Sequence, residues 1–167
     1  EEAGEHYAAG EYAKADSLYN LSLSQNPEWL EATFNKGDAL YRGGDFDGAA
    51  EQFTKIASKA QDKELKSEAY HNLGNTHMSK QEFDKAAASY RNALINDPSN
   101  EDSRYNLAYA QKLLQQQQQQ EQEQDQEGDE GEEGDENKDG EKGDQEQEGD
   151  ENKDGEQDEN KDGEDQE

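Results

Sequence analysis

Three asparagines recur along the chain, each directly after a side chain with a flat ring. The pairs are Phe34–Asn35, His71–Asn72 and Tyr105–Asn106. A primary amide offers two hydrogen-bond donors and one acceptor, so it can pair with a peptide group as another backbone would. A row of such amides can hold an extended peptide with little dependence on its sequence. The alternative is that these amides bridge neighbouring helices, because buried polar groups usually have a partner within the protein.

Catalytic chemistry has little support in the sequence. Glu68 and His71 match one half of a Glu-x-x-His carboxylate metal motif, which needs a second copy and further glutamates. The serines stand in no nucleophile turn, and the chain has neither a phosphate-binding glycine loop nor a zinc helix motif. We therefore expect a protein that is not an enzyme and takes no cofactor. Metal-dependent catalysis through Glu68 and His71 is the hypothesis to exclude.

The C-terminal part of the chain contains a short repeat that resembles the start of a calcium-binding loop. The sequence DENKDGE occupies residues 135–141 and returns at 150–156 and 158–164. Its spacing matches the first half of an EF-hand loop, and the candidate ligands in the first copy are Asp135, Asn137, Asp139 and Glu146. No amphipathic helices flank the copies, so we favour weak multivalent screening by Ca²⁺ or Mg²⁺ over a formed site.

Composition divides the chain after residue 114. The 167 residues carry a formal net charge of −28 and only 27% hydrophobic side chains, all of which lie in residues 1–114. Residues 115–167 hold 25 acids and 4 lysines, a net charge of −21. A segment without apolar side chains cannot offset its loss of backbone entropy by burial. We expect the glutamines at 115–120 to extend the last helix briefly, and residues 119–167 to form a disordered acidic tail.

Several classes of protein are excluded or disfavoured by these numbers. A strongly acidic chain repels polyanions, so we expect no nucleic-acid partner. The sequence has no run of about 18 apolar residues, so we expect no membrane span. The absence of cysteine excludes a disulfide framework and a thiolate nucleophile. The chain opens inside a helical pattern, and we expect a longer natural N-terminus before Glu1.

Internal repeats organise the first 118 residues. The sequence GEYAKA at residues 10–15 returns as GDFDGA at 44–49, at an offset of 34. Residues 45–49 of the second copy, DFDGA, return as EFDKA at residues 82–86, at an offset of 37. Within each unit, apolar and small residues recur at three- and four-residue spacing, which predicts two amphipathic helices. Gly37 and Gly74 would let two helix axes approach closely.

The period and the Gly–aromatic–Ala–aromatic–Pro pattern resemble tetratricopeptide repeats (TPRs), most specifically over residues 67–98. The resemblance implies an all-α TPR helix-turn-helix solenoid in a domain spanning residues 1–118. Its repeats would lie at about 1–27, 28–61 and 67–98, followed by a C-terminal capping helix over 99–118. An unfinished first repeat could pair with another chain, which makes an oligomer an open alternative.

In a TPR array the first helix of each repeat lines a concave groove, so the resemblance places our candidates on one face. The candidate peptide-binding groove consists of Phe34, Asn35, Asp38, Tyr41, Arg42, His71, Asn72, Asn75, Met78, Tyr105 and Asn106, with Tyr7 as the counterpart in the first unit. Phe34 and Tyr105 could equally be core residues. Glu31 and Glu68 lie nearby and would repel a peptide carboxylate, so an acidic peptide end is not the expected ligand.

Three segments carry a narrower resemblance. They are residues 32–41 (ATFNKGDALY), 70–75 (YHNLGN) and 102–108 (DSRYNLA), followed by a Gln-rich and then an acidic stretch. They look like the BatC family, the TPR proteins of Bacteroides aerotolerance (Bat) operons. This resemblance implies membrane-anchored von Willebrand A-domain partners, a MoxR-type AAA ATPase and a place on the periplasmic side of the bacterial envelope. A cytoplasmic location is the alternative.

The sequence therefore predicts a non-catalytic scaffold that binds an extended peptide or loop in the groove. The narrower resemblance implies that it assembles a Bat-type envelope complex linked to aerotolerance and stress. The alternative is an acidic, divalent-cation-responsive tail protein in which the TPR domain is only an anchor.

Overall fold

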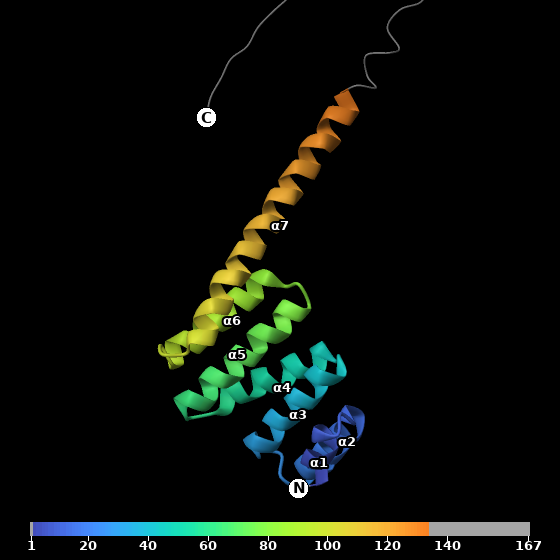
Figure 1. The fold of residues 1–167 in the computed structure, drawn as a ribbon, viewed down its shortest axis with the longest axis vertical. Coiled ribbons are helices and arrows are strands. Elements are labelled where there is room, and N and C mark those ends of the chain that lie inside the picture. The colour runs from blue at the N-terminus through green and yellow to red at the C-terminus, as the bar shows by residue number, and fades with distance from the viewer. Residues whose placement is uncertain (1, 134–167) are drawn as a thin grey trace, which may run out of the picture. The chain divides into compact units, whose positions relative to one another are not determined.

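The computed structural model describes residues 2–133, and it describes side chains up to residue 124. Within that range the chain forms seven helices: α1 (Glu2–Ala8), α2 (Tyr12–Gln25), α3 (Leu30–Gly43), α4 (Phe46–Lys59), α5 (Lys63–Ser79), α6 (Phe83–Asn96) and α7 (Glu101–Glu133). From α1 to α6, each helix packs against the next one in the chain (Figure 1). The described residues contain no strand, and the predicted all-α helix-turn-helix solenoid is confirmed.

Short polar side chains start several of these helices. The Asp45 carboxylate accepts a hydrogen bond from the backbone N–H of Gly48 at 2.9 Å, and Asp62 accepts one from Leu65 at 2.8 Å. The Asn100 amide oxygen accepts from the N–H of Ser103 at 2.8 Å, so it caps the start of α7. Such caps satisfy backbone donors that have no partner within the helix. Local sequence thus determines where α4, α5 and α7 begin.

Two glycine–aromatic contacts bring the paired helices together. A Cβ atom added to Gly37 of α3 would lie 2.8 Å from the ring of Phe53 in α4. A Cβ added to Gly74 of α5 would lie 2.5 Å from the ring of Tyr90 in α6. Both rings are buried, with 1% of their surface exposed. The small residues are therefore needed so that an aromatic ring can lie directly on the backbone of the facing helix.

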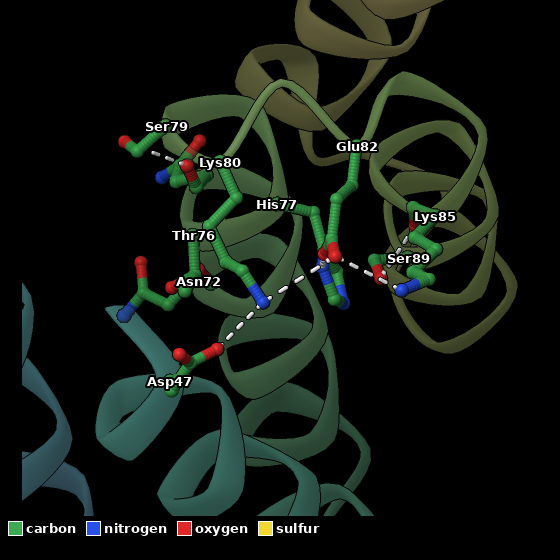
Figure 2. Close-up of polar contacts among 10 residues, drawn as sticks. Asp47, Asn72, Thr76, His77, Ser79, Lys80, Glu82, Lys85 and Ser89 are labelled. Carbon is green, nitrogen blue, oxygen red and sulfur yellow. Dashed lines mark hydrogen bonds and ion pairs between the residues drawn. The ribbon is translucent and has the colours of Figure 1, made fainter. Parts of the chain in front are cut away.

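Ion pairs reinforce the junction of α4, α5 and α6. Figure 2 shows Lys80, which follows α5, reaching the Asp47 carboxylate of α4 at 2.7 Å and the Glu82 carboxylate at 3.4 Å. Glu82 also contacts His77 at 2.6 Å and Lys85 at 3.0 Å. These three cationic or protonatable partners hold the pKa of Glu82 down, at about 2. The cluster joins two repeats on the outside of the core.

Helix α7 differs from its sequence-based prediction. It begins at Glu101 and extends to Glu133, past residue 118, where the capping helix was expected to end. Residues 119–133, which we assigned to the acidic tail, are therefore helical. Gln and Glu are good helix formers, and residues 101–127 contain neither proline nor glycine to stop the helix. The calcium-loop candidates Asp135, Asn137, Asp139 and Glu146 lie outside the described residues.

Candidate functional site

The candidate residues come from α3, α5 and the start of α7, which we call the first-helix face. Most of them are half-buried: Phe34, Asn35, Asp38, Tyr41, His71, Asn72, Asn75, Met78 and Asn106. Arg42 and Tyr105 are exposed. Half-burial leaves part of each side chain open to a ligand while its position is determined by packing. The first-helix face contains two cavities, which both use residues of α5.

The first, which we call the acid cavity, has a volume of about 300 Å³. It is lined by Phe34, Glu68, His71, Asn72, Asn100 and Asp102. The Phe34 ring packs edge-on against Phe53, with centroids 5.7 Å apart, and His71 packs against Tyr90 at 5.8 Å. The predicted residues Phe34, His71 and Asn72 are thus brought together. Two carboxylates lie beside them.

The second, which we call the tyrosine cavity, has a volume of about 310 Å³. It is lined by Tyr41, Asn75, Met78, Ser79, Tyr90, Asn106 and Tyr109. Four of these were predicted from the sequence, namely Tyr41, Asn75, Met78 and Asn106. No lining residue of this cavity carries a formal charge. The Tyr41 hydroxyl and the Ser79 hydroxyl lie 3.1 Å apart and connect α3 to α5.

Two of the three recurrent asparagines bridge the first helices of neighbouring repeats, α5 to α3 and α7 to α5. Asn106 donates to the Asn75 amide oxygen at 3.1 Å, and the same oxygen accepts from the Tyr90 hydroxyl at 2.7 Å. Asn72 donates to the Asp38 carboxylate across 3.5 Å, a weak contact. Each of these two asparagines uses one N–H in this way and keeps one N–H and its carbonyl oxygen. Bridging and peptide binding are therefore compatible at the same residue.

Asn35 differs from the other two asparagines. Its side chain makes no hydrogen bond to any residue in the described part of the chain. By the repeat register, the position in α1 that corresponds to Asp38 and Asn75 is Gly4, which has no side chain to accept a bond. A Cβ at Gly4 would meet no atom within 4 Å. Asn35 therefore has its full hydrogen-bonding capacity available.

Burial shifts the pKa of two groups on this face. It raises the pKa of Asp38 to about 6, an effect that Glu68 reinforces and Arg42 opposes. It lowers the pKa of His71, and the nearby Asp102 acts in the opposite direction. His71 Nδ1 also lies 2.8 Å from the Ser103 hydroxyl. At neutral pH His71 is consequently neutral and does not compensate the carboxylates of the acid cavity.

Some predicted residues lie outside both cavities. Tyr105 is 74% exposed, and Arg42 lies near the far end of α3, where Tyr7 raises its pKa. Asn35 and Asp38 belong to the same face without lining either cavity. Sequence reasoning missed Asn100, Asp102, Tyr90 and Tyr109 as lining residues. Tyr109 could have been found, because it has the register of Asp38 and Asn75 in the next repeat.

A larger cavity lies elsewhere. It has a volume of about 550 Å³ and is bordered by residues of α2, the end of α3 and the turns beside them, including Tyr12, Asp16, Leu40 and Gly43. No predicted residue lines it. The first-helix face has smaller cavities but gathers amides, rings and carboxylates from α3, α5 and α7. We therefore take the first-helix face as the candidate site.

Neither a metal centre nor a membrane span is found in the part of the chain that the structure describes. Glu68 and His71 both line the acid cavity, but residues 2–124 contain no group of three side chains suited to holding a metal ion. Of the described helices, none has the length and apolar character required to cross a bilayer.

Comparison with known proteins identifies the repeat. Two family models, both described as tetratricopeptide repeat, match residues 1–63 and 67–100. The chain is 31% identical over 114 residues to the protein STIP1 homolog of Dictyostelium discoideum; the match covers 66% of this chain and 20% of that protein. The chain thus spans about a fifth of that relative's length.

Two solved structures have a similar fold. One is a complex of the TPR2AB domain of yeast Sti1 with pHSP90, with a TM-score of 0.63 and 18% identity over 70% of this chain and 46% of that one. The other is the Sgt2 TPR domain from Aspergillus fumigatus, with a TM-score of 0.62 and 22% identity over 71% and 78%. At these identities the likeness shows the fold alone. The family models, which between them match residues 1–63 and 67–100, show that the chain belongs to the tetratricopeptide repeat family.

Proposed function

We propose that the chain is a non-catalytic protein-interaction module that holds an extended segment of a partner on its first-helix face. The observation that carries this proposal is the pair of cavities along α5, lined by rings and amides that come mainly from the first helices α3, α5 and α7. Rings supply contact area, and the free amide groups supply hydrogen bonds to a peptide backbone. Recognition of this kind depends on backbone shape as much as on side chains.

The partners we propose are those of a Bat-type envelope complex. The support is the resemblance of residues 32–41, 70–75 and 102–108 to the BatC family, with the acidic stretch that follows them. A von Willebrand A-domain protein would supply the bound segment, and a MoxR-type ATPase would act in the same system. This proposal includes a place on the periplasmic side of the bacterial envelope.

An acidic peptide end is not the ligand that we propose for this chain. Glu68 and Asp102 line the acid cavity, and Glu31 has the same register in α3. Carboxylates at these places would repel the carboxylate of an acidic peptide end. We therefore propose a protein segment without an acidic end as the ligand.

A titration of the full chain with a purified Bat-type von Willebrand A-domain protein tests the proposal. The variant for this test is Asn35→Ala with Tyr109→Ala, because neither side chain makes a hydrogen bond within the described residues. We expect a dissociation constant about tenfold higher for this variant, since Tyr109 is 47% exposed and lines the tyrosine cavity. Circular dichroism should show unchanged helicity.

The matched control is Leu21→Ala on α2, whose side chain is 59% exposed and lies outside the first-helix face. Equal losses in the two variants would move the interface away from this face. No binding by the unaltered chain would reject the Bat-type partner.

A further inference from the structure

Three first helices carry an acid at the same place. Glu31, Glu68 and Asp102 each lie four residues, or about one turn, before the asparagine of their own helix. All three side chains are exposed. None of them forms an ion pair within the described part of the chain, whereas Asp47 and Glu82 on the outside of the repeats do. The first-helix face therefore has a row of acids that form no ion pair among the described residues.

Resting on the proposed function, we propose that the bound segment is cationic: its lysine or arginine side chains meet Glu31, Glu68 and Asp102 while its backbone meets the asparagine amides. The acids and the amides lie on adjacent turns of the same helices, so one extended chain can reach both sets. The face thus selects a basic segment of a partner protein over a neutral or acidic one.

The acid cavity supports a cationic guest by its lining. Glu68 and Asp102 contribute two carboxylates, and His71 is neutral at neutral pH. Phe34 offers a ring close to these carboxylates, and aromatic rings attract cations. Asn72 and Asn100 add amides. At about 300 Å³ the cavity lies at the lower end of ligand pockets, which suits one long side chain better than a whole small molecule.

The spacing of the helices sets a period for the ligand. The first helices α3, α5 and α7 contact one another through Tyr41–Ser79, Asn72–Asp38 and Asn106–Asn75. We therefore take the spacing of about 8–10 Å that is typical of packed helices, and an extended chain advances about 3.3 Å per residue. One step from helix to helix therefore corresponds to about three residues of ligand. A segment with a basic residue at every third position would match the row of acids.

The rest of the chain favours the same partner. Its formal net charge of −28 attracts cations over distances set by salt, and raises their rate of encounter. Residues 115–167 carry 25 acids and 4 lysines, so neither this segment nor its copy in another molecule fits an acidic row. The acidic segment 115–167 of this chain or of a second copy is therefore not the occupant, and the occupant that we propose is a different protein.

Fluorescence titration of the full chain with three labelled peptides tests this inference. The first peptide has lysine at every third position with serine and alanine between, the second has glutamate in place of lysine, and the third has the lysines grouped at one end. We expect binding in the order spaced lysine, grouped lysine and glutamate. The double variant Glu68→Gln with Asp102→Asn should bind the spaced peptide about tenfold more weakly, with a smaller dependence on salt.

A variant with the same change in net charge provides the control. Glu51→Gln on α4 with Asp84→Asn on α6 removes two exposed acids that also form no ion pair in the described residues. If the two double variants lose affinity equally, only the overall charge of the chain attracts the peptide, and the inference is overturned. Equal binding of the glutamate peptide would overturn it as well.

The same samples separate this inference from the proposed function. If the A-domain protein binds in an Asn35- and Tyr109-dependent way but no lysine peptide does, the cationic ligand is rejected and the interaction face stands. If the spaced lysine peptide binds and the A-domain protein does not, the Bat-type partner is rejected and the cationic preference stands.

Discussion

The acid cavity and the tyrosine cavity lie on the same helices but offer a ligand different chemistry. In the acid cavity, Glu68 and Asp102 have no ion-pair partner among the described residues, and His71 is neutral. In the tyrosine cavity no side chain is charged, and the Asn75 oxygen already accepts two hydrogen bonds. The first can therefore discriminate ligands by charge, and the second by shape and contact area.

This difference shows that the position of a residue in the repeat and the chemical group it carries are determined separately. The repeated backbone brings equivalent positions to one face, and the residue present at each position then determines what that place can bind. Asp38, Asn75 and Tyr109 share one register position, yet they are respectively a half-buried acid, a doubly hydrogen-bonded amide and an exposed ring. Four changes to the chain test this contrast.

Gly74→Ala should have the largest effect, because it removes the support that both cavities share. The added Cβ would lie 2.5 Å from the ring of Tyr90, which lines the tyrosine cavity and packs against His71 of the acid cavity. We expect a loss of about 2–3 kcal/mol in the free energy of unfolding, measured with urea. Gly4→Ala, where a Cβ meets nothing within 4 Å, should be neutral or slightly stabilising. Equal stability of the two variants would mean that Tyr90 is free to move.

Asp38→Asn should stabilise the protein at pH 7.5 by about 1–2 kcal/mol, after allowance for partial exposure of the carboxyl. The raised pKa of about 6 means that the folded state favours the protonated carboxyl. The stability that the protonated Asp38 carboxyl gives the folded state is complete below the unfolded-state pKa of about 4. This stability is lost as the pH rises through the folded-state pKa of about 6. The variant keeps an oxygen that can accept from Asn72 and has no charge to bury. Thermal melts at pH 4 and 7.5 should show the gain only at the higher pH; a loss at pH 7.5 would contradict it.

Tyr90→Phe should cost about 1 kcal/mol, because it removes one neutral hydrogen bond and leaves the ring in place. The hydroxyl donates to Asn75 at 2.7 Å within the tyrosine cavity. We expect affinity for the spaced lysine peptide to change less than twofold, since the acid cavity keeps its carboxylates. A larger change in peptide affinity than in stability would show that the two cavities act as one.

Lys80→Ala should have the smallest effect. Lys80 forms ion pairs with Asp47 and Glu82 outside both cavities (Figure 2), and the Asp47 side chain is 87% exposed. Exposed pairs of this kind contribute about 0–1 kcal/mol. Peptide titration and urea unfolding should both lie close to those of the unaltered chain. A marked loss of peptide binding would place the ligand across α4 and α5 instead.

Much of the fold was predictable because the repeat can be recognised from residues that recur in the sequence. Gly37 and Gly74, and the aromatic residues that face them, recur in register, and they indicate close helix pairs before any coordinate is known. The end of α7 was not predictable in the same way. Local preference for helix in a Gln- and Glu-rich stretch does not mark an end point, and the segment has no proline or glycine before residue 128 to provide one.

The candidate site was only partly predictable. Phe34, His71, Asn72, Tyr41, Asn75, Met78 and Asn106 do line cavities, because repeat register determines which face a residue occupies. Tyr105 has the same register as His71, but it is 74% exposed and lines neither cavity. The bridging contacts of Asn72 and Asn106 depend on distances between helices. From the sequence alone, these amides could either bridge neighbouring helices or bind a peptide.

By itself, the sequence determined the helical repeat, the glycine–aromatic pairs and the three acids placed one turn before the asparagines. Each of these follows from periodicity along one chain. Only the tertiary structure decided that Asn75 accepts from both Tyr90 and Asn106, that Asp38 is buried enough to raise its pKa to about 6, and that Asn35 is left without a partner opposite Gly4. The physical reason is that hydrogen bonding and desolvation depend on separations of a few ångströms between different helices, which are set by how side chains pack rather than by their order in the chain.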